Sequence, residues 1–552
     1  MINFFRKYIF VIFRKEQFWF LLLAMLVSGT IWHKGYLFLL DWGISSGDIN
    51  VTDQSILLML LVSIGNIIYY GFFQKIILFI ILYLLGHGGF LLVTEVIDDT
   101  QYISIKKAIA YIGGIFMLIN PFVYERLIDG QWLVVSGMVC ILFMFIFLLR
   151  WQNLQQKKDI IFAIIWGSAA TMLSIHSIFF VLISVLIFFI IIMLHRKKYN
   201  VFMWFFILLC VICIVNLNII LGFILGVSQT YQIIEHINEQ HFQVFHTITN
   251  GYSSIYTNVA SLHGYWGENE GRFLSTQENI YIWKPIFFLF SGILFIGLWQ
   301  GRKKLIIQFF AGLGLISYIL ALGIEGVFAE ITQLLYEYIP FYIGLREPQK
   351  WVSIFVVCFI AIFTYGLFKI SITIPKVYIR NLMIVLMGIL IFLYTPTMLF
   401  GFYGQIKPKD FPIEWYNIKN DIGCDINDEQ NILFLPWHQY IKIDFLNNKK
   451  IISPAKNFFG DCVVQSDNME AKEVYNQNSK TNKDNIIEKY IIRHELVDNI
   501  CDEFVYNFQR ESIKYIILSK SDDYKKYLWL SNIKCINLLE ENNFLIVYQI
   551  IN

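Results

Sequence analysis

Residues able to do chemistry gather in five short stretches between long apolar runs. The stretches are Asp41–Asp48, Asn120–Arg126, His236–His246, Gly264–Glu268 and Leu345–Lys350. If sides are assigned to successive membrane crossings, all five emerge on the same side. Acids, guanidinium groups and aromatic rings collected at one membrane face indicate that a polar substrate is handled there.

The acids of the first stretch are candidates for catalysis. Asp41 directly follows the apolar sequence Leu37–Leu40, which keeps it near the bilayer, and Asp48 comes next in the stretch. A carboxylate at this depth can remove a proton from an acceptor hydroxyl or hold a divalent cation such as Mg²⁺ or Mn²⁺. A solvated loop acid is the structural alternative for either residue.

Three cations are candidates for binding the phosphate of a donor. Arg126 lies between two apolar runs, where a charge is costly unless it has a partner, and a guanidinium group can grip a phosphate through two hydrogen bonds. Arg346 and Lys350 precede another apolar run on the side where positive residues are depleted. Their stems also suit snorkelling toward the interface. The neighbouring polar residues expected to support these cations are Glu125, Gln131, Glu268 and Glu347.

Aromatic residues are candidates for binding a glycan acceptor, because their rings stack on sugar faces. Tyr265 and Trp266 lie beside acids in a long loop, although an aromatic belt at the membrane interface explains them equally well. Trp437, His438 and Tyr440 form a second group in the polar C-terminal part.

Histidines are weaker candidates. His236, His241 and His246 are spaced five apart, which does not match a zinc signature on a helix face. His176 lies between two apolar runs and suits either a proton relay or a packing role.

The elements that must position these residues are membrane-spanning helices. Of the 552 residues, 57% are hydrophobic and 15% are charged, and the deficit of charge lies in the first 400. We predict a polytopic α-helical membrane protein with eleven spans, at 17–33, 73–93, 108–122, 132–149, 160–175, 177–194, 201–226, 284–300, 305–324, 352–369 and 381–400. The basic loops then place the N-terminus in the cytoplasm. Ser55–Tyr70 fits as a re-entrant or interfacial helix, and its crossing would make twelve spans.

The composition changes near residue 405. We expect a transmembrane domain over 1–404 and a soluble extracytoplasmic α/β domain over 405–552, because short strand-like runs there flank the helical pattern Ile486–Phe508. The expected strands are Asn431–Leu435, Lys514–Leu518 and Phe544–Tyr548. Cysteines 424, 462, 501 and 535 allow two disulfides in three possible pairings, or free thiols.

Several functions are excluded or disfavoured. A net charge of +2 gives no indication of nucleic-acid binding. The chain has no phosphate-loop motif, no dinucleotide-binding glycine pattern and no nucleophilic serine elbow, which argues against ATP-driven transport by this chain.

The polar stretches together resemble a known superfamily. Asn120–Arg126 with Gly130–Trp132, Gly264–Trp266, Leu345–Lys350 and Leu435–Tyr440 look like a largely uncharacterised group of bacterial and archaeal membrane proteins within the GT-C superfamily of glycosyltransferases. The resemblance implies a polyprenyl-phosphate-linked sugar donor and chemistry at the outer face. It also implies a catalytic base or metal ligand in the first outer loop, which maps to Asp41, with Asp48 second. The closely paired acids usual in the superfamily are replaced here by two acids seven residues apart.

The resulting hypothesis is an inverting glycosyltransferase of the cell membrane. It would move a sugar from a polyprenyl-phosphate donor to a glycan or lipid acceptor of the cell envelope. Two rival functions use the same cations without a base: a transporter or flippase of lipid-linked glycans, and a non-catalytic envelope-assembly protein.

Overall fold

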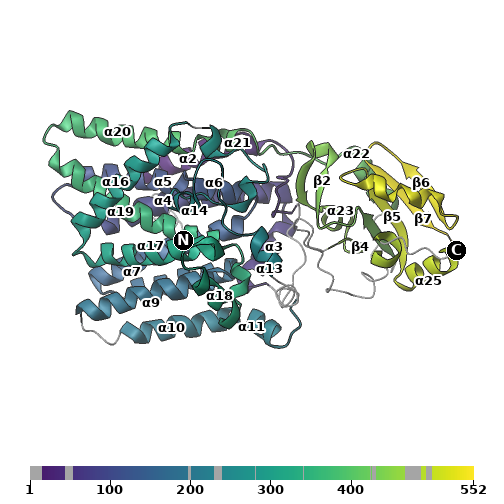
Figure 1. Ribbon diagram of the computed structural model, residues 1–552, viewed down its shortest axis with the longest axis horizontal. Helices are drawn as coiled ribbons and strands as arrows, with labels where there is room; N and C mark the ends of the chain where they lie inside the picture. The colour runs from purple at the N-terminus through teal and green to yellow at the C-terminus, as the bar shows by residue number, and fades with distance from the viewer. Residues whose placement is uncertain are drawn as a thin grey trace, which may run out of the picture.

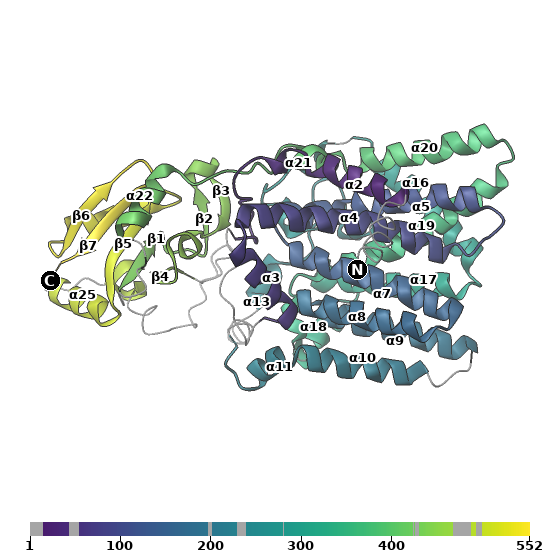
Figure 2. The same cartoon turned by 180° about the vertical axis from the view of Figure 1, so that it is seen from behind.

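The computed structural model describes residues 15–43, 54–196, 201–228, 239–279, 281–339, 341–422, 424, 430–466, 487–492 and 500–551. Its helices run side by side in a bundle, and a mixed α/β domain projects from one end of that bundle (Figure 1). Seen from behind, α7, α8, α9 and α10 follow one another across one flank of the bundle (Figure 2). The chain is a multi-pass membrane protein.

Eight helical segments among the described residues are long and apolar enough to cross a membrane. They are α4 (Tyr70–Val96), α5 with α6 (Ile103–Leu118 and Pro121–Ile128), α7 (Trp132–Leu154), α9 (Ser177–Arg196), α16 (Trp283–Gly301), α17 (Leu305–Leu322), α19 (Val352–Thr373) and α20 (Val377–Tyr394). A ninth span results if α10 (Val201–Val215) and α11 (Leu217–Ile224), which meet at a 69° bend, are counted together.

By length and composition, eight or nine of the eleven spans expected from hydropathy are shown among the described residues. Two of the predicted spans are helices of 14 and 17 residues, α2 (Lys15–Ser28) and α8 (Lys157–Leu173). Helix α2 continues into the 3-10 turn η1 (Gly29–Trp32). Helix α3 (Ile56–Ile67) has 12 residues and is too short to cross by itself.

Glycines let two central helices come into backbone contact. A Cβ atom added to Gly297 of α16 would lie 2.2 Å from the carbonyl oxygen of Ile362, and one added to Gly366 of α19 would lie 2.1 Å from that of Ile293. Small residues at helix crossings are typical of membrane bundles, where close packing replaces the hydrophobic drive.

The soluble domain is built on a five-stranded sheet with the order β4-β1-β5-β7-β6. Strand β1 (Asn431–Leu435) is parallel to β4 (Val463–Val464) and β5 (Ile513–Ser519), whereas β7 (Leu545–Ile550) is antiparallel to β5 and to β6 (Ile536–Glu541). The three expected strands are confirmed. Both faces are apolar: α22 (Ile413–Ile422) and α23 (Ala455–Phe459) contribute to one core, and α25 (Ile500–Arg510) contributes to the other.

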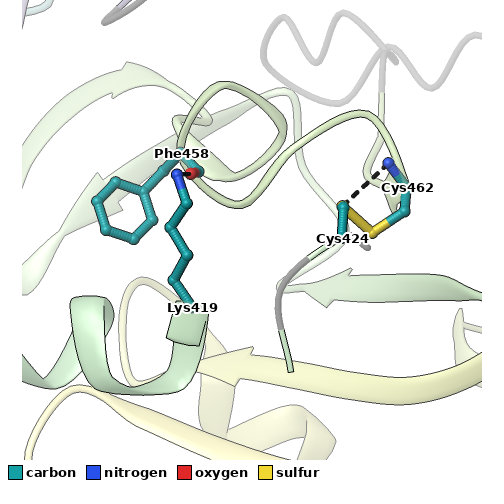
Figure 3. Close-up of a disulfide and its surroundings, with 4 residues drawn as sticks. All are labelled: Lys419, Cys424, Phe458 and Cys462. Carbon is teal, nitrogen blue, oxygen red and sulfur yellow. Dashed lines mark hydrogen bonds between the residues drawn. A yellow bond between two sulfur atoms is a disulfide. The ribbon is translucent and has the colours of Figure 1, made fainter. Parts of the chain in front are cut away.

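The four cysteines of this domain form the disulfides Cys424–Cys462 and Cys501–Cys535. Beside the first of them, Lys419 Nζ donates a hydrogen bond to the carbonyl oxygen of Phe458 (Figure 3). Disulfides persist in oxidising compartments, so this pairing agrees with an extracytoplasmic position of the domain.

An extended segment, residues 36–42, lies between the two domains. The backbone of Tyr36 exchanges two hydrogen bonds with Lys409, at 2.9 and 3.1 Å. Phe38 is buried in the core of the soluble domain, whereas Leu37 and Leu39 are buried in the membrane-domain core. This alternation is the period of an extended chain, whose successive side chains point to opposite faces. It brings Asp41 to the junction of the two domains.

Candidate active site at the junction of the two domains

Asp41 is exposed at the junction, and both of its carboxylate oxygens accept hydrogen bonds. Oδ2 accepts from Gln131 Nε2 at 2.9 Å, and Oδ1 accepts from the hydroxyl of Tyr440 at 3.1 Å. The Asp41 amide donates to the carbonyl oxygen of Asp129 at 2.8 Å. Loss of hydration among the surrounding protein atoms raises the pKa of the Asp41 carboxyl, and the hydrogen bond from Gln131 offsets part of that rise. A raised pKa brings an acid closer to the value that a general base needs.

The turn that carries Gln131 is shaped to approach Asp41. Helix α6 begins at Asn120, whose side chain accepts a hydrogen bond from the Val123 amide, with Pro121 at the first helical position. The helix ends before Gly130, which has a φ of 84°. A Cβ atom on Gly130 would lie 2.9 Å from the amide nitrogen of Trp42, so the contact between the two loops requires glycine.

Arg126 donates a hydrogen bond to the side-chain oxygen of Gln131 and so orients the amide that contacts Asp41. Its Nη1 donates to Gln131 Oε1 and, at 2.7 Å, to Glu347 Oε2, while Nη2 donates to Gln349 Oε1. The side chain is fully enclosed, and its guanidinium carbon lies 4.3 Å from the ring centre of Tyr265. Asp41, Gln131, Arg126 and Glu347 thus form one continuous hydrogen-bonded chain, from the solvent-accessible acid to the buried ion pair.

Lys350 extends this chain into the bundle. Glu347 and Lys350 lie on either side of the start of the 3-10 turn η5 (Pro348–Trp351), which places their charged atoms 3.3 Å apart. Lys350 Nζ is also 3.0 Å from His176 Nε2, so the histidine accepts as a neutral ring. Burial disfavours ionisation of Glu347, but Lys350 and Arg126 outweigh it and lower the pKa of the carboxyl. Arg346 is half-buried and stacks 5.1 Å over Phe245.

A second charged cluster adjoins Asp41 through the backbone of Asp129. Asp129 Oδ2 is 3.5 Å from Arg272 Nη1, and the Arg272 guanidinium lies 4.2 Å over the ring of Trp266. Burial raises the pKa of Asp129 to about 6, although the charge of Arg272 opposes that rise. Burial lowers the pKa of Lys449, a residue of the soluble domain, and the negative charge of Asp129 opposes that fall. Neither Asp129 nor Lys449 was among the residues that sequence patterns singled out.

The remaining predicted residues contact groups other than Asp41 or are buried. Trp437 is buried in the soluble domain, where its amide donates to Tyr527 at 3.2 Å, and His438 Nε2 is 3.1 Å from Asp523 Oδ1. Tyr265 and Trp266 are buried, so their rings offer no open stacking face, and acceptor binding by them stays a prediction. Glu125 accepts a hydrogen bond from Gln349 Nε2 at 3.3 Å, and Glu268 accepts one from the Ser275 hydroxyl. Asp48 and His236 lie outside the described residues.

The described residues do not form a donor set for Mg²⁺ or Mn²⁺. No group of three or more histidine, cysteine, aspartate or glutamate side chains in this part of the chain is arranged to hold a metal ion. Both oxygens of Asp41 are already engaged by an amide and a hydroxyl group. Metal binding by Asp41 stays a prediction, and no chemical step is routed through it.

Comparison with known proteins concerns the fold. No protein-family model and no curated protein sequence matches the chain. Among solved structures, the arabinofuranosyltransferase AftD from Mycobacteria superposes with a TM-score of 0.64 at 9% identity, over 98% of this chain and 40% of that chain. A mutant of AftD superposes with a TM-score of 0.61 at 9% identity, over 98% of this chain and 42% of that chain. The oligosaccharyltransferase of Archaeoglobus fulgidus gives 0.42 at 12% identity, over 91% and 65%.

The chain shares its fold with AftD. The GT-C resemblance expected from the polar stretches is therefore confirmed at the level of architecture. At this identity the likeness extends to the fold alone, and the chain spans about 40% of the length of AftD.

Proposed function

We propose that this protein is a membrane glycosyltransferase that moves a sugar from a polyprenyl-phosphate donor to a glycan or lipid acceptor of the cell envelope. The observation that carries the proposal is the solvent-accessible Asp41 carboxylate, linked through Gln131 to a buried cluster of cations at the end of a membrane bundle. The GT-C fold supports the same reaction class. AftD, which has that fold, is an arabinofuranosyltransferase.

In the proposed mechanism Asp41 is the general base. Its carboxylate takes the proton of the acceptor hydroxyl while the acceptor oxygen forms a bond to the anomeric carbon of the donor sugar. The bond between that carbon and the phosphate oxygen breaks, and its electron pair leaves with the lipid phosphate. One displacement of this kind inverts the anomeric centre.

The cations stabilise the departing phosphate by charge. Arg346 is half-buried, which suits it to contact a phosphate, and Lys350 lies in the same turn region behind it. Arg126 is fully enclosed by its three hydrogen-bond partners. It therefore acts in this proposal through its field and by orienting Gln131, and not by gripping the phosphate.

We propose further that the N-terminus is cytoplasmic and that the soluble domain and Asp41 face outward. The two disulfides of the soluble domain support this orientation. The prenyl tail of the donor would then lie in the bilayer while its phosphate meets the cations at the outer edge.

A transfer assay on one variant separates the enzyme from a lipid transporter. The purified protein is incubated with a panel of polyprenyl-phosphate sugars and envelope acceptors, and both transfer and donor binding are measured. Asp41→Asn should lower transfer by about 10²–10⁴-fold, the usual contribution of a general base, and leave donor binding intact. Asp410→Asn is the matched control, because Asp410 is also at the junction but pairs with Lys34 and Tyr69. Unchanged transfer by Asp41→Asn contradicts the proposal and favours the transporter.

A further inference from the structure

The β2–β3 hairpin of the soluble domain faces both domains at once. Strand β2 (Tyr440–Ile443) pairs with β3 (Lys449–Ile452) in antiparallel register. Ile441, Ile443 and Ile451 are buried in the core of the soluble domain. Tyr440 instead packs against the core of the membrane domain, as the two-residue period of a strand requires.

Two contacts join this hairpin to the segment that carries Asp41. The Tyr440 hydroxyl donates to Asp41 Oδ1 at 3.1 Å, and the Ile452 amide donates to the carbonyl oxygen of Leu40, also at 3.1 Å. Tyr440 and Ile452 are direct partners in the hairpin, and Leu40 and Asp41 are neighbours in the chain. The two hydrogen bonds therefore join adjacent positions of the hairpin to adjacent positions of the segment. Together they fix the Tyr440 hydroxyl relative to the Asp41 carboxylate.

We propose that Tyr440 is a positioning residue for the general base, so that the soluble domain completes the transferase site. The hydroxyl of Tyr440 holds one oxygen of Asp41 while Gln131 holds the other. An ionised carboxylate has about four lone-pair positions, so two hydrogen bonds fix its plane and still leave room for the acceptor proton. This inference rests on the proposed function and gives Tyr440 a different role from the acceptor binding expected from its sequence context.

The two roles predict different kinetics for Tyr440→Phe, which keeps the packing of the ring. Loss of a hydrogen bond to a charged group should lower kcat about tenfold and leave the acceptor KM within about twofold. It should also shift the acid limb of the kcat/KM profile to higher pH, because that hydrogen bond favours the ionised form of Asp41. Other charged or titratable groups also act on Asp41 or on the residues that contact it. They are Arg126, which is bonded to Gln131, and Asp129, Tyr265, Arg272, Arg346 and Glu347.

A second measurement needs no turnover. A water-soluble carbodiimide modifies protonated carboxyl groups, so the pH dependence of Asp41 labelling in the purified full-length protein reports its protonation, with the labelled peptide measured by mass spectrometry. Half-labelling should move to higher pH in Tyr440→Phe. Tyr506→Phe is the matched control, because Tyr506 is 66% exposed on the same domain and should leave both measurements unchanged.

The outcomes separate this inference from the proposed function. A raised acceptor KM with an unmoved acid limb assigns Tyr440 to the acceptor and overturns the inference. Unchanged kinetics and labelling overturn it as well. If Asp41→Asn abolishes transfer in either case, the proposed glycosyltransferase stands without this role for Tyr440. If Asp41→Asn retains full transfer, the proposed function itself fails, whereas the labelling shift in Tyr440→Phe still tests the contact.

Discussion

At the scale of single residues, the site is a chain of hydrogen bonds that begins at an exposed acid and ends at enclosed charges. Separating a buried ion pair leaves each charge uncompensated at a cost of about 3–5 kcal/mol, so the paired side chains are held in place. Rigidity is what a general base requires, since its carboxylate must stay in line with the acceptor hydroxyl. The enclosed position of Arg126 therefore supports a role in orientation.

The pKa of Asp129 makes a prediction for stability against pH. Its folded-state pKa is about 6, above the ordinary 3.8, so the folded protein binds this proton more tightly than the unfolded chain. This proton binding contributes fully to the free energy of unfolding below about pH 4. About 3 kcal/mol of that free energy is lost as the pH rises through 6. Asp129→Asn mimics the protonated acid and should remove this loss. The variant should gain melting temperature over the parent protein at pH 7 but not at pH 4, measured in detergent. Equal differences at both pH values would contradict the assignment.

The sequence alone singled out Asp41, the cations and two of the residues that contact them, Gln131 and Glu347, but not Asp129. Asp41, Arg126, Gln131 and Glu347 were found because charge beside apolar runs on one side of a membrane is unusual. Asp129 was missed because a single loop acid has no pattern that distinguishes it from a solvated one. Its importance arises from burial beside Arg272 and from its backbone bond to Asp41, and neither contact leaves a trace in residue spacing.

At the scale of elements, apolar runs predicted where helices lie better than how far they extend. The run at 17–33 becomes α2 followed by the 3-10 turn η1, and the run at 160–175 becomes α8, which begins three residues earlier and ends two residues sooner, because hydropathy does not record where backbone geometry changes. The break at Asn120 was likewise invisible to hydropathy, although its capping side chain and the following proline are recognisable afterwards.

The crossing of α16 and α19 gives a prediction for packing. Gly297→Ala would place a methyl group 2.2 Å from the Ile362 carbonyl oxygen, and the helices must move apart to admit it. Overpacking of this kind costs about 1–3 kcal/mol, so the melting temperature in detergent should fall. Gly292→Ala is the matched control on the same helix, since nothing lies within 4 Å of its added Cβ atom. If both substitutions raise the melting temperature equally, the higher helix propensity of alanine governs the result and the close crossing of the two helices is contradicted.

At the scale of the whole molecule, the candidate site is shared between domains that composition alone would separate. The change near residue 405 predicts a polar tail with strands, and the sheet confirms those strands. It does not predict that Phe38, from the N-terminal part, completes the core of the soluble domain, or that Tyr440 reaches Asp41 across 399 residues of sequence. Contacts at such separations depend on the closed fold and have no local pattern.

The orientation of the protein in the membrane can be tested by labelling single cysteines. Asn269 is exposed in the loop before α16, and Lys303 is exposed just after it, so one membrane crossing separates them. In a background in which Cys140, Cys210, Cys213 and Cys358 are replaced by serine, Asn269→Cys should react with a membrane-impermeant thiol reagent in intact cells. Lys303→Cys should react only after the cells are permeabilised, because basic loops stay in the cytoplasm. The opposite labelling pattern would put Asp41 and the disulfide-bonded domain on the cytoplasmic side, where disulfides are not expected to persist. That result would remove the outer-face reaction proposed for this protein, whatever its fold.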